Sequence, residues 1–332
     1  MKIDFVIPWV DGSDPVWRAE KAKYEPKTVD QDKSGDSRYR DWDNLQYWFR
    51  AVEKNTPWVN KIFFVTCGQV PDFLNLNHPK LRFVRHQDFI PQQYLPTFSS
   101  CSIEIHLHRI QDLCEHFVYF NDDFFVNRPL AEEFFFKNGK PRYLMVDRPY
   151  DERELTNSHQ RMRRNGMEIV NRHFSRKDLQ AAGWGKIVNP LYGRANVKNL
   201  LVHLTQDHFC QFQDMHLPES FLKSTFEEVW TMEGDILEKT ARNRFRAENG
   251  VNQYLFRYWD LARGNFVPRG VHGTRYNMRM SCLDACVRDI LSAKSPCICI
   301  NDSPECDDFD TCKARIRDAF QKRYPEKSSF EL

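Results

Sequence analysis

Three adjacent polar residues, Asn121, Asp122 and Asp123, lie between two apolar and aromatic runs of the sequence. The run before them, 116–120, has the composition of a buried strand. We therefore expect the three side chains where that strand leaves the core, which is where parallel α/β sheets form their sites. Two carboxylates beside an amide oxygen suit a hard cation such as Mg²⁺. The alternative is a polar turn with solvated acids, which the second aromatic run, 124–126, disfavours.

A second acidic segment, Asp11-Gly12-Ser13-Asp14, follows the first apolar run of the chain. Gly12 permits a tight turn, and the two carboxylates flank that turn. A strand that runs into a glycine turn is a common position for a bound nucleotide. Asp-Gly is also the commonest turn dipeptide, so an ordinary turn is an equal alternative.

Glu104, His108 and Arg109 belong to a stretch that we predict to be a helix. Hydroxyl residues at 97–100 are typical of a helix start, and the apolar residues that follow recur with helical spacing. Glu104 and His108 are four residues apart, so a helix would let them meet. The alternative for each histidine of this stretch is a position on the helix surface.

Further candidates lie late in the chain. His216 precedes Leu217-Pro218, and a proline restricts the backbone of the residue before it. Arg246 and Asn249 belong to 240–256, which we predict to be helical, and Asn301-Asp302 ends another apolar run. Taken singly, such a histidine is more often a core residue, and such an arginine a surface charge.

The elements that must position these residues follow from the apolar patterns. We predict strands at 3–10, 61–66, 81–86, 116–120, 143–147 and 297–300, a helix at 38–52 and a polar loop at 21–37. Strands and helices alternate over 1–147, which predicts an α/β fold of the nucleotide-sugar-transferase (GT-A/Rossmann-like) type, with helices flanking a central sheet.

We divide the chain into an α/β core (1–150), a helical insertion (151–205) and a remainder (206–332) that completes the site. The insertion begins with a basic cluster, which also precedes Trp184 and Tyr192. The cluster comprises Arg153, Arg161, Arg163, Arg164, Arg172, Arg176 and Lys177. Basic and aromatic residues together suit an interfacial surface that touches anionic lipid or glycan; a solvated helical face is an equal alternative.

Composition excludes several classes of protein. The chain has 332 residues, 41% of them hydrophobic and 28% charged, with a net charge of +2. This is a globular composition without the basic excess of a nucleic-acid-binding protein. No apolar run reaches the ~18 residues of a membrane span, and Asp4 disfavours a signal peptide. We expect a cytoplasmic chain, with contact at the inner face of the membrane as a further possibility.

Six of the ten cysteines lie in the C-terminal part of the chain. These are Cys282, Cys286, Cys297, Cys299, Cys306 and Cys312. Their spacing does not match a paired Cys-x₂-Cys site, so we favour buried thiols over a structural zinc.

Taken in order, four blocks of the chain resemble the Stealth family of sugar-phosphate transferases, which includes bacterial capsular polysaccharide phosphotransferases and the lysosomal-enzyme N-acetylglucosamine-1-phosphotransferase. The blocks are 3–15 (IDFVIPWVDGSDP), the long segment from Ser37-Arg38 through Ile103-Glu104 to Asp123, the segment from Met215-His216 to Arg246, and 299–302 (CIND). Each motif is short, but four in this order cover most of the chain.

The resemblance implies transfer of a sugar-1-phosphate, hexose or N-acetylhexosamine, from a nucleotide sugar such as UDP-GlcNAc to a glycan hydroxyl. The product is a phosphodiester of a capsular or exopolysaccharide, and a nucleoside monophosphate leaves. The implied partners are the nucleotide-sugar donor, the glycan acceptor and other capsule-synthesis proteins, with no nucleic acid.

The resemblance also suggests roles. His216 would be the general base, and Arg246 would clamp phosphate oxygens together with Arg38 or Arg109. Mg²⁺ or Mn²⁺ would be held by Asp122, Asp123 and Asp302, and Asp14 would assist catalysis near the metal. The expected substrate-binding residues are Asp11, Gly12, Arg38, Glu104, Arg109, Asn121, Asn249 and Asn301. Two alternatives remain: a metal-dependent glycosyltransferase that releases a nucleoside diphosphate, and a non-catalytic carbohydrate-binding protein.

Overall fold

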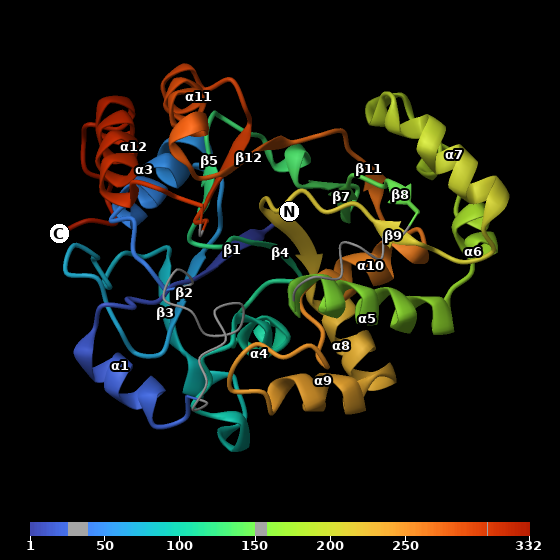
Figure 1. Ribbon diagram of the computed structural model, residues 1–332, viewed down its shortest axis with the longest axis horizontal. Helices are drawn as coiled ribbons and strands as arrows, with labels where there is room; N and C mark the ends of the chain where they lie inside the picture. Colours follow the sequence, from blue (N-terminus) through green and yellow to red (C-terminus); the bar gives the residue numbers. More distant parts are fainter. Residues whose placement is uncertain (26–38, 150–157, 304) are drawn as a thin grey trace.

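A five-stranded sheet forms the centre of the computed structural model, which describes residues 1–25, 39–149, 158–303 and 305–332. Its strand order is β10-β4-β1-β2-β3 (Figure 1). The strands are β1 (Ile3–Pro8), β2 (Ile62–Thr66), β3 (Leu81–Arg85), β4 (His116–Tyr119) and β10 (Glu219–Leu222). All neighbours are parallel except β10, which pairs antiparallel with β4. The carboxyl ends of β1 and β4 therefore meet at one edge, beside the start of β10.

The central strands are apolar on both faces because helices cover both faces. Alternate residues of β1 point to opposite sides: Phe5 and Ile7 join the core around Trp48, whereas Val6 joins the core around Trp259. Figure 1 shows the helices in two corresponding groups. One group consists of α3 (Leu45–Asn55), α11 (Met280–Ser292) and α12 (Phe309–Arg323). The other consists of α4 (Ser100–Glu104), α5 (Ser158–His173), α8 (Lys223–Met232), α9 (Gly234–Ala241) and α10 (Tyr254–Ala262).

A smaller sheet, of order β12-β13-β5, carries the last apolar run. Its strands are β5 (Phe124–Val126), β12 (Gly273–Asn277) and β13 (Cys297–Asn301). β13 is antiparallel to β5, with Cys299 opposite Phe124. This register places the end of β13 beside the acidic residues that precede β5.

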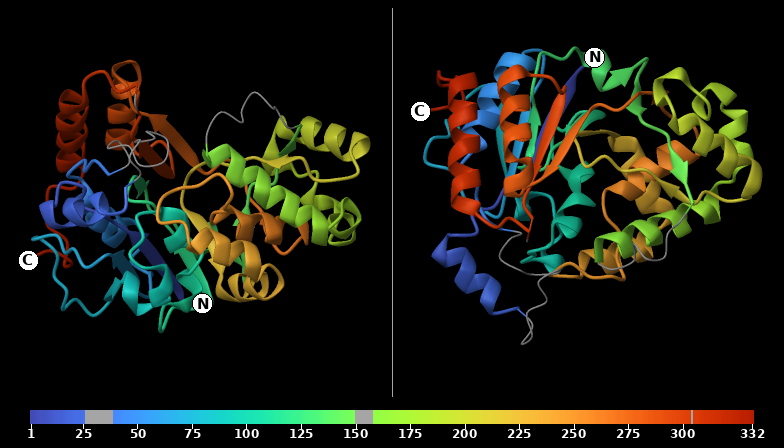
Figure 2. Two further views of the ribbon diagram at one scale, coloured as in Figure 1. Left: turned by 60° about the horizontal axis from the view of Figure 1, so that its bottom comes forward. Right: turned by 45° about the horizontal axis from the view of Figure 1, so that its top comes forward.

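The remaining elements extend the molecule at its edges. They are α1 (Pro15–Ala22), α6 (Arg176–Ala181), α7 (Ala195–Thr205), β6 (Phe136–Lys137), β7 (Lys140–Tyr143), β8 (Asp147–Arg148), β9 (Gln211–Phe212) and β11 (Val267–Pro268). The two views of Figure 2 show α6 and α7 at the opposite end of the molecule from α11 and α12. Among the described residues, no helix combines the length and apolarity needed to cross a bilayer.

The predicted α/β fold of the nucleotide-sugar-transferase type is confirmed, and β1, β2, β3, β4 and β13 coincide closely with predicted strands. The loop predicted at 21–37 lies mostly outside the described residues. The helix predicted at 38–52 begins only at Leu45. The predicted boundaries at 150 and 205 stay predictions.

Two helix predictions are wrong. The helix expected from 97 to Cys114 ends at Glu104, and a separate 3₁₀ turn covers Leu107–Arg109. Residues 240–256 are not one helix, because α9 ends at Ala241 and α10 starts at Tyr254. In both segments tertiary contacts outweigh the local apolar spacing.

Candidate active site

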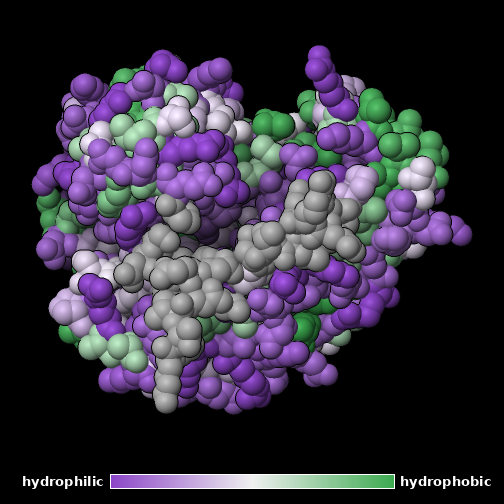
Figure 3. All heavy atoms as spheres, viewed as in Figure 1, coloured by the Kyte–Doolittle hydropathy of each residue, from purple (hydrophilic) through white to green (hydrophobic). Residues whose placement is uncertain are grey.

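A cavity of about 820 Å³ opens at the carboxyl ends of β1 and β4. Figure 3 shows the surface hollowed near the centre of the face drawn in Figure 1. Segments far apart in the sequence line the cavity, among them the end of β1, the β4–β5 turn, α4, the turn before β10, the loop before α10 and the end of β13. Eight of the predicted site residues contribute to its wall: Glu104, Asn121, Asp122, Asp123, His216, Arg246, Asn301 and Asp302.

The acidic residues occupy the turn that joins the two sheets. β4 ends at Tyr119 and β5 starts at Phe124, so Asp122 and Asp123 lie in the short connection between them. The backbone carbonyl of Asp123 accepts a hydrogen bond from the Ile300 amide at 2.9 Å, which fixes the turn against β13. The carboxylates are therefore held by strands on both sides rather than by a surface loop.

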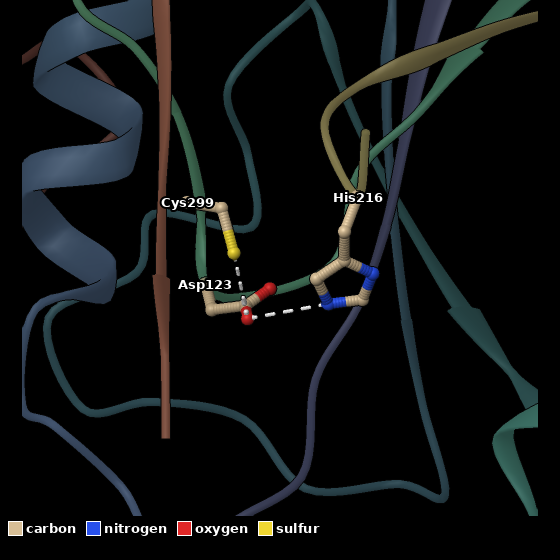
Figure 4. Close-up of side chains that lie close together, drawn as sticks. All are labelled: Asp123, His216 and Cys299. Atoms are coloured by element: carbon tan, nitrogen blue, oxygen red, sulfur yellow. Dashed lines mark hydrogen bonds and ion pairs between the residues drawn. The ribbon is translucent and has the colours of Figure 1, made fainter. Parts of the chain in front are cut away.

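His216 reaches this turn because of strand pairing. β10 is antiparallel to β4, with Glu219 opposite Tyr119, so the residues before β10 lie beside the residues after β4. Its imidazole Nε2 lies 3.8 Å from Asp123 Oδ2, and both side chains are 18% exposed (Figure 4). The backbone of His216 is left-handed, with φ of 51°, a conformation that is uncommon for residues other than glycine.

Cys299 completes this group of side chains. Its thiol donates a hydrogen bond to Asp123 Oδ2 at 3.3 Å (Figure 4). Burial raises the pKa of Cys299 well above its ordinary value, and the neighbouring Asp123 carboxylate raises it further. The thiol therefore stays protonated and acts as a donor that orients Asp123. The sequence had pointed to the end of this strand, but not to Cys299 itself.

One carboxylate oxygen of this turn lacks the partner that a buried polar atom usually has. Asp123 Oδ1 is buried and has no hydrogen-bond partner among the described residues. Enclosure raises the pKa of Asp123 to about 6. It also raises the pKa of Asp122 to about 7, with further contributions from the charges of Asp123 and Asp41. The Arg275 cation opposes this rise at Asp123, and two neighbouring carboxylates with raised pKa values are an arrangement that a bound cation would stabilise.

The histidine is neutral in this environment. Burial, together with the cations of Arg275 and Arg246, lowers the pKa of His216 to about 3. Its Nδ1 lies 3.2 Å from the Tyr254 hydroxyl, and its ring packs edge-on against Phe124 at 4.9 Å between ring centroids. The imidazole is thus held on two sides, with Nε2 directed toward the carboxylates.

Glu104 is buried at the inner wall of the cavity. It accepts hydrogen bonds from the Tyr119 hydroxyl at 3.2 Å and from the Gln253 amide at 3.4 Å. The expected pairing with His108 does not form, because α4 ends at Glu104 and the helical spacing stops there. His108 instead packs against the rings of Phe226 and Trp230.

Arg246 lies in the loop between α9 and α10 rather than in a helix. The preceding residues anchor this loop: the Arg244 guanidinium donates to the Pro96 carbonyl at 2.7 Å, and Phe245 stacks on Phe98. The Arg246 side chain lines the cavity and forms no hydrogen bond or ion pair with the residues that the structure describes. The charge of Arg246 lowers the pKa of the buried Glu104 carboxylate, while its hydrogen-bond donors remain available to an anion in the cavity.

Other predicted site residues lie at the rim or away from the cavity. Asp302 lines it but is paired with Arg40, whose Nε and Nη2 donate to its two oxygens at 2.8 and 2.5 Å. Asp14 caps α1 by accepting from the Val16 and Trp17 amides, and its pKa is lowered chiefly by the hydrogen bond from Gln69.

Like Asp14, four other predicted residues in the described part of the chain do not contribute to the wall. Asp11 accepts from the Ser13 amide and hydroxyl within its own turn. A side chain at Gly12 would collide with the Tyr39 carbonyl, so this glycine permits a close backbone approach. Arg109 stacks on Trp230 outside the cavity, and Asn249 accepts a hydrogen bond from Asn243 on the surface. Arg38 lies outside the described residues.

The basic cluster of the insertion does not form a free cationic surface among the described residues. Arg163 and Arg176 are buried, and Arg161, Arg164 and Arg172 pair with Glu248, Glu168 and Glu233 respectively. Arg153 lies outside the described residues. The C-terminal cysteines likewise do not converge on a zinc site there: the one grouping of three potential metal ligands in that part of the chain is Asp123, His216 and Cys299.

Sequence reasoning missed several residues of the cavity wall. Tyr254 and Arg163 lie on helices whose apolar spacing gave no reason to single them out, and Arg275 lies on the edge strand β12. Asp41 was part of a recognised block, but only the fold shows that it faces Asp122. In the sequence, Asp41 could have been singled out because another acidic residue lies close to it in a segment otherwise rich in arginine and aromatic residues.

Comparison with known proteins gives similarity over the whole chain. Residues 38–143 match Stealth protein CR2, conserved region 2, and residues 1–29 match Stealth protein CR1, conserved region 1. The chain is 42% identical to the capsular polysaccharide phosphotransferase WcwK of Streptococcus pneumoniae, covering 99% of this chain and 98% of the relative. It is 37% identical to the receptor polysaccharide phosphotransferase WefC of Streptococcus gordonii, covering 100% and 99%. It is 36% identical to the exopolysaccharide phosphotransferase cps2G of Lactiplantibacillus plantarum, covering 99% and 96%.

Proposed function

Because this chain belongs to the Stealth family of polysaccharide phosphotransferases, we propose that it moves a sugar-1-phosphate from a nucleotide sugar to a glycan hydroxyl. The sugar would be a hexose or N-acetylhexosamine, with UDP-GlcNAc as a representative donor. The chain is a transferase of phosphorus-containing groups that acts in capsular or exopolysaccharide synthesis. The observation that carries the finer proposal is the cavity, which joins the adjacent Asp122 and Asp123 carboxylates, the Arg246 guanidinium and a neutral histidine.

The bond changes define what the residues must do. The acceptor oxygen forms a bond to the phosphorus that bears the sugar, and the bond from that phosphorus to the bridging oxygen breaks. The nucleoside monophosphate leaves with that oxygen, and the acceptor proton must go to a base. Such transfers depend mainly on positioning and on stabilising negative charge at phosphate oxygens.

His216 is the base in this proposal. Its ring is neutral, so it can accept a proton, and Nε2 would be the accepting nitrogen if Nδ1–H donates to the Tyr254 hydroxyl 3.2 Å away. Arg246 and Arg275 lower the pKa of His216. Anionic phosphates beside these arginines would offset part of that effect and move the pKa toward the range of an effective base.

The carboxylates fit a divalent cation. The orphaned Oδ1 of Asp123 and the raised pKa of Asp122 both fit a site that lacks its counter-charge. We propose that Asp122 and Asp123 hold Mg²⁺ or Mn²⁺, which would neutralise charge on the donor pyrophosphate. Asp302 is engaged with Arg40, so it supports the wall rather than supplying a free ligand. Arg246 would bind non-bridging phosphate oxygens through its guanidinium fork.

One rival uses the same residues. A metal-dependent glycosyltransferase would also hold a nucleotide sugar with carboxylates and a cation, but it breaks the sugar–oxygen bond and releases a nucleoside diphosphate. A non-catalytic carbohydrate-binding protein, the other alternative, would not require a neutral histidine beside unpaired carboxylates and does not fit the phosphotransferase relatives.

The released nucleotide tests the proposal. The purified chain is incubated with Mg²⁺ or Mn²⁺, a panel of nucleotide sugars and a glycan acceptor, and the products are separated by anion exchange and identified by mass. A monophosphate together with a phosphodiester-linked product is expected. A diphosphate together with a glycoside would replace the proposal by the rival.

We also propose that the chain works at the inner face of the membrane, where a growing glycan and other synthesis proteins would be its partners.

A further inference from the structure

Helix α7 presents four of its apolar residues to solvent and several of its polar residues to the protein. Val197 is 73% exposed, Leu200 40%, Leu201 59% and Leu204 70%. These four positions fall on one side of the helix by its 3.6-residue period. A surface helix of a globular protein normally has the opposite arrangement, with its apolar stripe against the core. The outer stripe of α7 is therefore unpartnered.

The inner face of α7 combines the buried Val202 with polar contacts. Asn199 accepts from the Asp147 amide at 2.8 Å and donates to the carbonyls of Met145 at 2.8 Å and Ile187 at 3.1 Å. Asn196 accepts from the Asn189 amide and donates to its carbonyl. These bonds hold the helix in one orientation, so the outward position of its leucines is built into the fold.

The apolar stripe continues onto the preceding turns. Trp184 is 53% exposed and packs edge-on against His203 of α7, at 5.1 Å between ring centroids. Val188 and Leu191 are also exposed. Among the described residues, seven of the seventeen exposed large hydrophobic side chains fall within 184–204. Figure 3 shows hydrophobic residues gathered over the end of the molecule formed by α7. We call this surface the α7 patch; its members are Trp184, Val188, Leu191, Val197, Leu200, Leu201 and Leu204.

The charged residues within 180–205, the segment that carries the α7 patch, are of one sign. No Asp or Glu occurs between Leu179 and Gln206. Arg194 and Lys198 are exposed and form no ion pair with the residues that the structure describes. They are four residues apart, so they lie along one edge of the leucine stripe. The arginines of α5 differ, since their exposed members are neutralised by glutamates.

We propose that the α7 patch docks this protein on an anionic lipid surface. Aliphatic side chains and a tryptophan bordered by free cations are the features of a helix that lies in the membrane interface, with its apolar face at the headgroup–acyl boundary. The absence of acids favours anionic lipid over an ordinary protein partner, because acidic lipids attract Lys and Arg near the surface. The lipid contact is thus made by α7 and the turns before it rather than by the basic cluster at 153–177.

Vesicle co-sedimentation tests the proposal. The full chain is mixed at low salt with vesicles of phosphatidylcholine alone or of phosphatidylcholine with phosphatidylglycerol, and the bound fraction is measured. We expect binding to the phosphatidylglycerol vesicles. L201Q/L204Q should weaken it about tenfold or more, because apolar insertion is lost. Lys198→Gln should weaken it about fivefold, which corresponds to about 1 kcal/mol for one cation near the surface.

Matched controls distinguish vesicle binding through the α7 patch from nonspecific hydrophobic binding. Met232→Gln with Leu291→Gln removes two exposed hydrophobic side chains elsewhere and should leave vesicle binding unchanged. All variants should keep normal turnover with a free acceptor in solution, which separates the docking proposal from the catalytic one. Absence of binding by the unaltered chain, or binding that L201Q/L204Q does not reduce, overturns the proposal. So does light scattering that shows a dimer which L201Q/L204Q converts to monomer without any vesicle binding, since the patch would then pair with a second copy.

Discussion

Arg246 in the cavity and Arg176 near the β8–β9 pair both come from arginine-rich stretches, but the two guanidinium groups have different surroundings. Arg176 is buried and satisfied: it donates to Asp147 Oδ2 at 2.5 Å and to the His208 carbonyl at 2.9 Å. Arg246 is only partly buried and forms no hydrogen bond or ion pair with the described residues, although its charge lowers the pKa of the buried Glu104. The carboxylates differ in the same way, because Asp147 also accepts from the amides of Cys210 and Gln211, whereas Asp123 Oδ1 accepts nothing there.

This contrast separates structural charges from functional ones. A buried ion pair with all its hydrogen bonds made fixes the fold and has nothing left for a ligand. Charges that the fold positions without pairing carry an energetic cost that a substrate or cation can relieve. The comparison therefore assigns catalysis to the cavity and assigns stability to the β8–β9 region. A separate variant can test each assignment.

The largest expected effect is loss of the metal or of its principal ligand. Chelator should reduce turnover to background, and added Mg²⁺ or Mn²⁺ should restore it. Asp123→Asn should lower turnover by about a thousandfold or more, since charge neutralisation at the phosphates is worth several kcal/mol. Thermal unfolding should be little changed. Asp284→Asn, an exposed acid on α11, is the control. Full activity in chelator would remove the metal from the proposal.

His216→Asn tests the base. Asparagine tolerates the left-handed backbone found at this position better than alanine does. The variant should lose about a hundredfold to ten-thousandfold in kcat, the usual contribution of a positioned base, while donor affinity measured by calorimetry stays nearly constant. His208→Asn, an exposed position, is the control. Lost donor affinity with unchanged kcat would instead make His216 a binding residue.

Arg176→Met tests the structural side of the comparison. Removing one member of a buried pair leaves Asp147 charged and poorly compensated, which typically costs about 3–5 kcal/mol. The free energy of unfolding in urea should fall by that amount, with kcat per folded molecule unchanged. The exposed neighbour Lys177→Met should have almost no effect. A stable Arg176→Met variant with impaired kcat would mean that Arg176 serves catalysis rather than stability.

Arg246→Lys keeps the charge but removes the guanidinium fork. Loss of one charged hydrogen bond corresponds to about 1.5–3 kcal/mol, so kcat/KM should fall roughly tenfold to hundredfold. Arg242→Lys, on an exposed pair with Glu238, should be neutral. Equal activity of Arg246→Lys and the unaltered chain would mean that any cation suffices at this position.

How far the sequence predicted this site depends on the kind of contact. The Asn121–Asp123 turn was predictable because a buried strand and its polar end are adjacent in the sequence. The position of His216 was supported mainly by family resemblance, since only the antiparallel pairing of β10 with β4 brings it to the turn. The helix at 97–114 was mispredicted because the chain turns at Glu104 to bury that carboxylate against Tyr119. Apolar spacing contains no information about such a turn.

The cations show the same limit. From the sequence, Arg176 could belong to a lipid- or glycan-binding surface or to a solvated face, and Arg246 could be a phosphate ligand or a surface charge. The difference between them arises from backbone carbonyls and a carboxylate that lie tens of residues away in the chain, so no local pattern could distinguish them. The apolar face of α7 was likewise hidden, because the period of a helix shows which residues share a face but not which face meets the protein.

The smallest expected effect concerns Arg109, which the family resemblance suggested as a phosphate ligand. The structure places its guanidinium carbon 4.7 Å from the centre of the Trp230 ring, outside the cavity wall. Trp230 is itself anchored, since its Nε1 donates to the Ile105 carbonyl at 2.7 Å. Arg109→Ala should therefore leave kcat and KM unchanged and lower stability by only about 0.5–1 kcal/mol, the value of an exposed cation–π contact.

Trp230→Leu tests whether the contact with the Trp230 ring causes this loss of stability, because Arg109 should contribute nothing to stability once the ring is gone. Arg109→Ala should then have no additional effect on stability in the Trp230→Leu background. A tenfold or larger loss of turnover in Arg109→Ala alone would show that this arginine reaches the substrate. In that case, an arginine already engaged with an aromatic ring could still serve catalysis, and the absence of a partner would no longer separate the functional cations of this fold from its structural ones.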